Sequence, residues 1–126
     1  MKRIIILLMI FGFVISGCTK DTSENKHKTI SSLEAIEMME SEKDYIIVDV
    51  RTPEEFADGH IEGAINIPLD TISTSIPELP NKNQLIMIYC RSGNRSNQAA
   101  NKLDDLGYTN VIDFGGINTW PNELVK

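Results

Sequence analysis

The sequence predicts an α/β fold in which a parallel β-sheet is flanked by helices on both faces. Segments with the apolar character of strands alternate along the chain with segments of helical character, which is typical of parallel sheets. Residues 45–50 and 85–89 are continuous apolar runs of strand length, as expected for strands buried on both faces. The chain has 126 residues, of which 41% are hydrophobic and 24% charged, so we expect one globular domain.

The first elements of this domain are expected at residues 29–41. A short edge strand is expected at 29–30, followed by a helix at 32–41. Ser31 and Glu34 have the spacing of a capping box, and apolar Leu33, Ile36 and Met39 follow at three-residue intervals.

The later elements follow the same alternation. Gly59 and Gly63 predict a tight turn before a strand at 65–67. A helix that begins near Ser96 and carries Ala99, Ala100, Leu103 and Leu106 on one face is expected to end at Gly107. The other expected elements are an irregular helical segment at 69–79, a turn at 81–84, a strand at 111–114 and a final short helix that packs Trp120 on the core.

The N-terminus has the pattern of an export signal. Met1, Lys2 and Arg3 are followed by twelve mostly apolar residues, a run shorter than a membrane span. With Ser16 and Gly17 before Cys18, this pattern resembles the bacterial lipoprotein signal, which implies cleavage after residue 17 and lipidation of Cys18 with acyl chains such as palmitate. A plain signal peptide or an uncleaved anchor is the alternative.

The lipoprotein interpretation divides the chain into three parts. Residues 1–17 are the expected signal peptide, 18–28 a polar tether, and 29–126 the folded domain. His27 lies in the tether and is expected to be solvated, without a partner. The expected location is outside the cytoplasm, with the protein anchored through Cys18 to a bacterial cell membrane.

The stretch from residue 86 to 96, IMIYCRSGNRS, is the candidate active site. The apolar run predicts that Cys90 ends a strand and faces the start of a helix, at the edge where open α/β sheets bind ligands. Backbone amides, the helix dipole and the charges of Arg91 and Arg95 would favour a thiolate. Gly93 would let the backbone wrap closely around the sulfur. The alternative is a buried, inert cysteine.

Several motifs, in the order in which they occur along the chain, resemble those of the rhodanese, or sulfurtransferase, family in its single-domain form. The resemblance covers residues 29–124. The motifs are Asp49-Val50-Arg51, Glu54-Glu55-Phe56, Gly59-His60-Ile61, Gly63-Ala64, Asn66-Ile67-Pro68, the stretch from Cys90 to Ser96, and Gly115-Gly116 followed four residues later by Trp120.

This resemblance implies a rhodanese-like fold and a role for each loop residue. Cys90 would be the nucleophile that accepts sulfur, forming a persulfide. The loop formed by Arg91, Ser92, Gly93, Asn94 and Arg95 would bind the substrate through its amides, with Arg91 and Arg95 as candidate ligands of thiosulfate. The implied partners are a thiosulfate-like sulfur donor and a thiol or cyanide acceptor.

A phosphatase or arsenate-reductase-like reaction is an alternative for a cysteine in such a loop. Tyrosine-type and dual-specificity phosphatases use Cys-x5-Arg, whereas Cys90 and Arg95 form Cys-x4-Arg, which resembles the shorter rhodanese loop. A third possibility is a non-enzymatic persulfide carrier or a redox-sensing binding module.

Three other polar residues lie near the predicted site in sequence. Asp49 and Arg51 end a predicted strand, and we expect them to support the site, with Glu55 as a possible ion-pair partner of Arg51. His60 is expected in a structural turn, and a role as general base is the alternative. We expect no cofactor and no metal site.

Composition restricts the partners. The net charge of −6, without a basic stretch, argues against nucleic acid as a partner. We expect a monomer.

Overall fold

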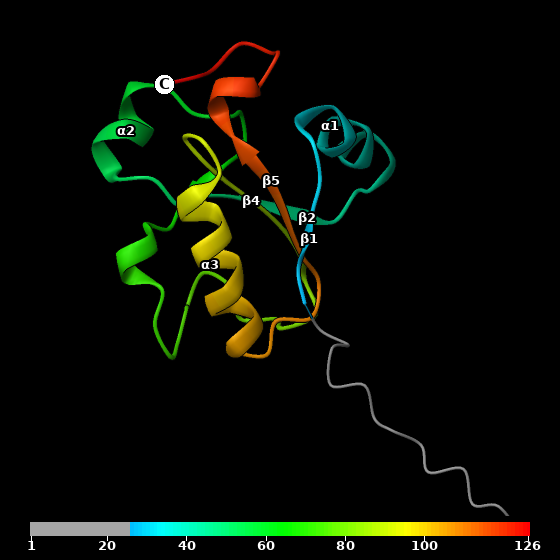
Figure 1. Ribbon diagram of the computed structural model, residues 1–126, viewed down its shortest axis with the longest axis vertical. Coiled ribbons are helices and arrows are strands. Elements are labelled where there is room, and N and C mark those ends of the chain that lie inside the picture. Colours follow the sequence, from blue (N-terminus) through cyan, green and yellow to red (C-terminus); the bar gives the residue numbers. More distant parts are fainter. Residues whose placement is uncertain (1–25) are drawn as a thin grey trace, which may run out of the picture.

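The structure, a computed structural model, describes residues 26–126 as a five-stranded sheet with helices packed against both faces (Figure 1). The sheet order is β1-β5-β4-β2-β3, and all neighbouring strands are parallel. The strands are β1 (Lys28–Thr29), β2 (Tyr45–Asp49), β3 (Ile65–Asn66), β4 (Leu85–Cys90) and β5 (Val111–Gly116). The α-helices are α1 (Ser32–Ser41), α2 (Pro53–Asp58) and α3 (Asn94–Asp105), with short 3-10 helices at Leu69–Thr71 and Ile117–Thr119.

Strand β4 lies in the middle of the sheet and positions the predicted nucleophile. It pairs with β2 on one side, where Asp49 lies opposite Tyr89, and with β5 on the other, where Gly116 lies opposite Cys90. Because the strands are parallel, their carboxyl ends meet at one edge of the sheet. Asp49, Cys90 and Gly116 therefore lie at that edge together.

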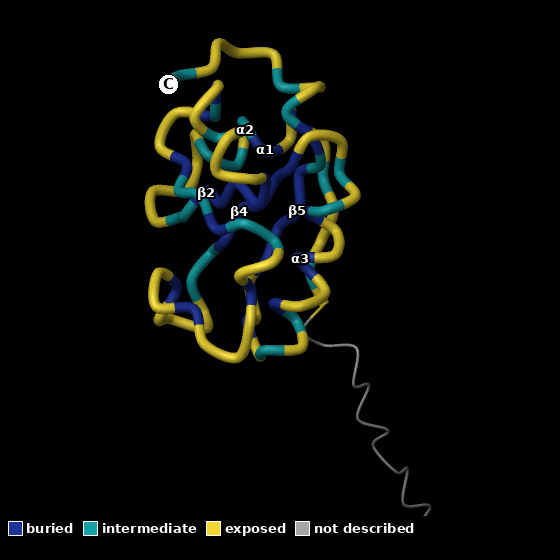
Figure 2. Tube along the Cα trace, turned by 90° about the vertical axis from the view of Figure 1, so that its left-hand side faces the viewer, coloured by how far each residue is buried: buried dark blue, intermediate teal, exposed yellow. Residues whose placement is uncertain are grey.

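The two faces of β4 belong to two separate parts of the core. Ile86, Ile88 and Cys90 pack in the cluster that includes the buried residues of α3, whereas Met87 and Tyr89 pack in the cluster that includes α1. Helices α1 and α3 accordingly lie on opposite sides of the sheet in Figure 1, and Figure 2 shows the central strands buried between exposed outer segments. This arrangement confirms the predicted fold and explains why β4 is apolar at every position before Cys90.

Local signals predicted several boundaries correctly. Helix α1 spans the predicted residues, and Ser31 and Glu34 form the capping box, with the Glu34 amide donating to Ser31 Oγ at 3.1 Å. Gly107 adopts a φ of +90° after α3, in the left-handed region that glycine tolerates best. Trp120 packs against Phe114 with ring centroids 5.7 Å apart, as expected.

The starts of helices α2 and α3 were not predicted correctly. Helix α2 begins at Pro53, where Thr52 and Glu55 form a second capping box, a signal present in the sequence but not used. Helix α3 begins at Asn94, two residues before the expected Ser96, because Gly93 with a φ of +104° turns the chain into the helix.

The expectation that His27 is solvated and unpartnered is wrong. Its backbone amide donates to Asp104 Oδ1 at 2.9 Å, and its ring Nδ1 lies 2.7 Å from Asp104 Oδ2. The pairing of β1 with β5 brings this residue beside the end of α3, from a position 77 residues earlier in the chain. Local sequence carries no signal of such a contact.

The predicted signal peptide and Cys18 lie outside the described residues, as does most of the predicted tether. Within residues 26–126, no helix has both the length and the apolar character needed to cross a membrane.

Candidate active site

Cys90 ends β4 and its sulfur faces the turn that leads into α3. The residue is 1% exposed, and the Gly93 amide donates a hydrogen bond to Sγ at 3.0 Å. The first amides of a helix have no partner within the helix, so the start of α3 adds further N–H groups beside this turn. A sulfur that carries negative charge would be stabilised by this environment.

Ser96 is a residue of the site that sequence reasoning did not single out. Its side chain is fully buried in the first turn of α3, and its hydroxyl lies 3.5 Å from Cys90 Sγ. The hydroxyl donates to the Gly93 carbonyl at 3.1 Å, and the Gly115 carbonyl lies 3.4 Å away. Ser96 thus joins the start of the helix to the backbone of the loop and to the end of β5.

The end of β5 supports the loop from the other side. Between the pairs Ile88–Asp113 and Cys90–Gly116, β5 contains one residue more than β4, and the bulge places Gly115 at a φ of +86°. The Asn118 amide then donates to the Arg91 carbonyl at 3.2 Å. A Cβ atom at Gly116 would collide with the Arg91 carbonyl and would lie 2.7 Å from Ser92 Cα. Only glycine allows β5 to approach the loop this closely.

Asp49 and Arg51 form a buried ion pair at the end of β2. Arg51 Nη2 lies 2.7 Å from Asp49 Oδ2 and also donates to the Gly59 carbonyl at 2.7 Å. Burial opposes the charge of Arg51, but hydrogen bonds to Asp49 raise its pKa above the ordinary value. The pair ties β2 to the turn at Gly59, which is consistent with a supporting role.

Glu55 is paired with Arg95, so the expectation that it pairs with Arg51 is wrong. Arg95 donates through Nη1 to Glu55 Oε1 at 2.7 Å and through Nη2 to Oε2 at 3.0 Å. These hydrogen bonds lower the pKa of Glu55 to about 2 and raise that of Arg95. Arg51 instead pairs with Asp49, the last residue of β2. Its backbone amide and its Nη2 both donate hydrogen bonds to the Asp49 carboxylate.

The other predicted loop residues lie at the surface. Arg91, Ser92 and Asn94 are exposed, whereas Gly93 is half-buried. Among residues 26–126, Arg91 belongs to no ion pair, unlike Arg51 and Arg95. The structure therefore places one unpaired guanidinium directly after the cysteine.

His60 makes contacts of a structural kind. Its Nδ1 lies 2.9 Å from the Phe56 carbonyl, and its ring stacks on Phe56 with centroids 3.8 Å apart. Its backbone also pairs with Val125 near the C-terminus. These contacts favour the structural turn over the alternative of a general base.

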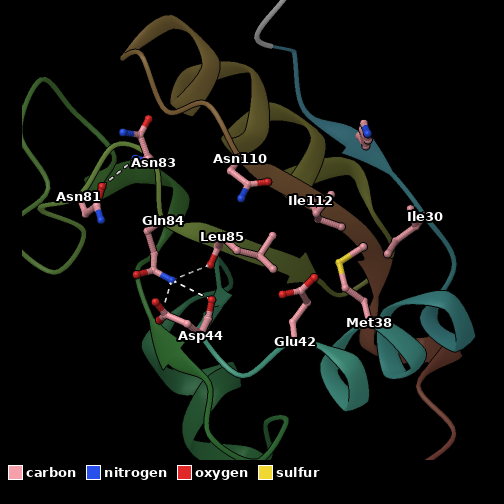
Figure 3. A pocket seen from close by; sticks show the side chains of 11 residues that line it. Ile30, Met38, Glu42, Asp44, Asn81, Asn83, Gln84, Leu85, Asn110 and Ile112 are labelled. Atoms are coloured by element: carbon pink, nitrogen blue, oxygen red, sulfur yellow. Dashed lines mark hydrogen bonds between the residues drawn. The ribbon is translucent and has the colours of Figure 1, made fainter.

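Among the hollows of the described residues, two lie at opposite edges of the sheet. One of about 510 Å³ adjoins the loop and is lined by residues around Ser92, Gly116 and the start of α1. The other, of about 370 Å³, lies where the strands begin, and Figure 3 shows Asp44, Gln84 and Asn110 around it. Only the first includes a residue of the loop that carries Cys90.

The described residues offer no cluster of three or more His, Cys, Asp or Glu side chains that could hold a metal ion. The groups at the loop that could react with a substrate or bind it are a thiol, a hydroxyl, backbone amides and guanidinium groups.

Comparison with known proteins agrees with this geometry. Residues 31–123 match the model of the family described as "Rhodanese-like domain". The chain is 42% identical over 80 residues to the thiosulfate sulfurtransferase PspE of Escherichia coli, an alignment covering 63% of this chain and 77% of that protein. It is 43% identical over 79 residues to a sulfurtransferase of Allochromatium vinosum, covering 62% and 73%.

A solved structure, titled as a rhodanese with anions from E. coli, superposes with a TM-score of 0.60 at 37% identity. The superposition covers 65% of this chain and 98% of that one. Since the family match spans most of the chain and includes the cysteine loop, the chain belongs to the rhodanese-like domain family and is a transferase of the rhodanese type.

Proposed function

We propose that this protein transfers sulfane sulfur from a thiosulfate-like donor to a thiol or cyanide through a persulfide on Cys90. The observation that carries the proposal is the Gly93 amide donating to Cys90 Sγ at 3.0 Å, at the point where β4 ends and α3 begins. A sulfur held in this way can take up and release negative charge without rearrangement of its surroundings.

In the first half of the reaction, the Cys90 thiolate attacks the outer sulfur of thiosulfate. A new S–S bond forms to Cys90, the S–S bond of the donor breaks, and its electron pair leaves with sulfite. In the second half, an acceptor thiolate or cyanide attacks the outer sulfur of the persulfide. The Cys90–sulfur bond breaks, and the thiolate is restored with its electron pair.

Binding of the donor is assigned to the loop amides and to Arg91. Arg91 is exposed and, within the described part of the chain, has no carboxylate partner. A relative of known structure is described as a rhodanese with anions from E. coli, which supports an anionic donor. The buried Asp49–Arg51 pair supports the site without contacting the donor in this proposal.

The location is proposed from the sequence. The pattern that ends at Cys18 supports lipidation of that residue and anchoring of the domain to a bacterial membrane, outside the cytoplasm. Cys90 would then be the single thiol of the mature chain.

The test of the reaction is an assay of sulfur transfer from thiosulfate to cyanide, with wild type and Cys90→Ser compared. We expect full loss of transfer in the variant with an unchanged melting temperature, because serine is nearly isosteric with cysteine but accepts sulfur poorly. Transfer by Cys90→Ser at the wild-type rate would contradict the proposal. Release of phosphate from an aryl phosphate by wild type, without sulfur transfer, would support the phosphatase alternative instead.

A further inference from the structure

The arginines near the loop do not contribute equally to its charge. Arg51 is neutralised by Asp49 in a buried pair, and Arg95 is neutralised by Glu55 in a pair whose side chains are 31% and 29% exposed. Arg91 has no ion-pair partner among residues 26–126. The loop therefore has one uncompensated cation, although its sequence contains two arginines.

Glu55, the partner of Arg95, also makes hydrogen bonds with Thr52. Its Oε1 lies 3.2 Å from Thr52 Oγ1, and the Glu55 amide donates to the same hydroxyl at 3.3 Å. This capping box fixes the carboxylate on the first turn of α2. The planar guanidinium of Arg95, which meets both carboxylate oxygens, is then fixed relative to the start of α3.

We propose that Glu55 is a positioning residue that sets the affinity of the loop for anions by engaging Arg95 and cancelling its charge. The inference rests on the proposed function of Cys90. The donor and the product sulfite are both anions, so a second free guanidinium would bind both more tightly. Binding that is equally strong for donor and product slows release without helping the chemical step.

The chain offers a matched pair of variants to test this role. Glu55→Gln removes the carboxylate charge but keeps an oxygen that can accept from Thr52, so the start of α2 is preserved. Glu54→Gln removes the same charge from the neighbouring position, where the side chain is exposed and forms no ion pair within the described part of the chain.

The first measurement is the rate of Cys90 alkylation in the full chain, determined by mass spectrometry of the Cys90 peptide. The ratio of the rate with anionic iodoacetate to the rate with neutral iodoacetamide reports the local potential, because the two reagents are similar in size. We expect Glu55→Gln to raise this ratio roughly three- to tenfold and Glu54→Gln to leave it within about twofold of wild type. Arg95→Gln should lower the ratio, and the double variant Glu55→Gln/Arg95→Gln should return it to the wild-type value.

The second measurement is the kinetics of sulfur transfer by the same variants. Glu55→Gln should lower KM for thiosulfate and strengthen inhibition by sulfite, with no rise in kcat. A lower melting temperature without these kinetic changes would mean that the Glu55–Arg95 pair has only a structural role. Equal alkylation ratios for Glu55→Gln and Glu54→Gln would overturn the inference.

The two proposals fail separately. If wild type transfers no sulfur, the proposed function is wrong, whereas the alkylation ratios still decide whether Glu55 controls the charge at Cys90.

Discussion

Arg91 and Arg95 are the first and last residues of the loop that follows Cys90, and they differ in what they contact. Arg95 meets Glu55, which lies 40 residues earlier, whereas Arg91 is exposed. The sequence alone predicted both as candidate anion ligands, because charge and proximity to Cys90 were the available signals. A contact between residues so far apart in the chain has no local signature, and the structure was needed to separate the two roles.

Arg91→Ala is therefore expected to weaken the use of thiosulfate. Loss of one charge-assisted contact at an exposed position corresponds to about 1.5 kcal/mol, or roughly a tenfold fall in kcat/KM. The melting temperature should stay near that of wild type, because Arg91 makes no ion pair among residues 26–126. Steady-state kinetics over a range of thiosulfate concentrations measures the effect. Unchanged kcat/KM would show that the backbone amides bind the donor without it.

At the scale of elements, the loop is held between the start of α3 and the end of β5. Gly116→Ala would place a methyl group against the Arg91 carbonyl and Ser92 Cα, so the loop would have to move. Overpacking of this kind costs about 1–3 kcal/mol of stability. We expect sulfur transfer at saturating thiosulfate to fall more than tenfold, because the loop amides would no longer surround the sulfur.

Gly115→Ala is the control for this prediction. A Cβ at Gly115 meets nothing within 4 Å, so the variant adds backbone strain at a φ of +86° without pressing on the loop. It should lose stability but keep more activity than Gly116→Ala at a temperature where both are folded. The reverse order of activity would contradict the role assigned to Gly116.

The ion pair between α2 and α3 predicts how stability depends on pH. Glu55 has a pKa of about 2 in the folded protein, against an ordinary value of 4.5. The unfolded chain thus takes up the proton first as the pH falls, so the stabilisation is complete above about pH 4.5 and is lost as the pH approaches 2. Urea unfolding between pH 6 and 2 should show wild type losing its advantage over Glu55→Gln in this range. If the free energy of unfolding of both proteins changed with pH in parallel, the lowered pKa of Glu55 would be contradicted. Glu54→Gln serves as the control.

Elements differed in how well they could be predicted. Helix α1 was predicted near its observed bounds because Ser31 and Glu34 mark its start. The predicted apolar series is wrong at Leu33, which is 66% exposed, whereas Ala35 is buried. Helix α2 was not predicted because its six residues are too few to show a periodic pattern, although Thr52 and Glu55 form the same capping signal. The bulge at Gly115 could not be predicted, since it arises from the pairing of β5 with β4.

At the scale of the whole molecule, the predicted sheet is confirmed, with one core cluster on each of its faces. Continuous apolar runs predicted it because strands of a parallel sheet are buried on both faces. Contacts between residues far apart in the chain could not be predicted from the sequence. His27 was expected to be free, but it contacts Asp104, which shows that the folded unit extends to residues that composition alone would place in a linker.

The expected location of the whole protein is tested by fractionation of cells that express it. If Cys18 carries two or three acyl chains, wild type should remain with the membranes in high salt and carbonate. Cys18→Ala should remain unprocessed and lack the acyl chains, as shown by mass spectrometry of the intact protein. Soluble wild-type protein that retains Met1 would contradict the lipoprotein proposal while leaving the family assignment unchanged.

The most direct measurement is the mass of the Cys90 peptide after incubation of the purified protein with thiosulfate and removal of excess donor. The proposed mechanism predicts a gain of one sulfur atom on Cys90, lost again when cyanide is added, with thiocyanate formed in equal amount. An unchanged mass on Cys90, with sulfur transfer still occurring, would contradict the persulfide mechanism.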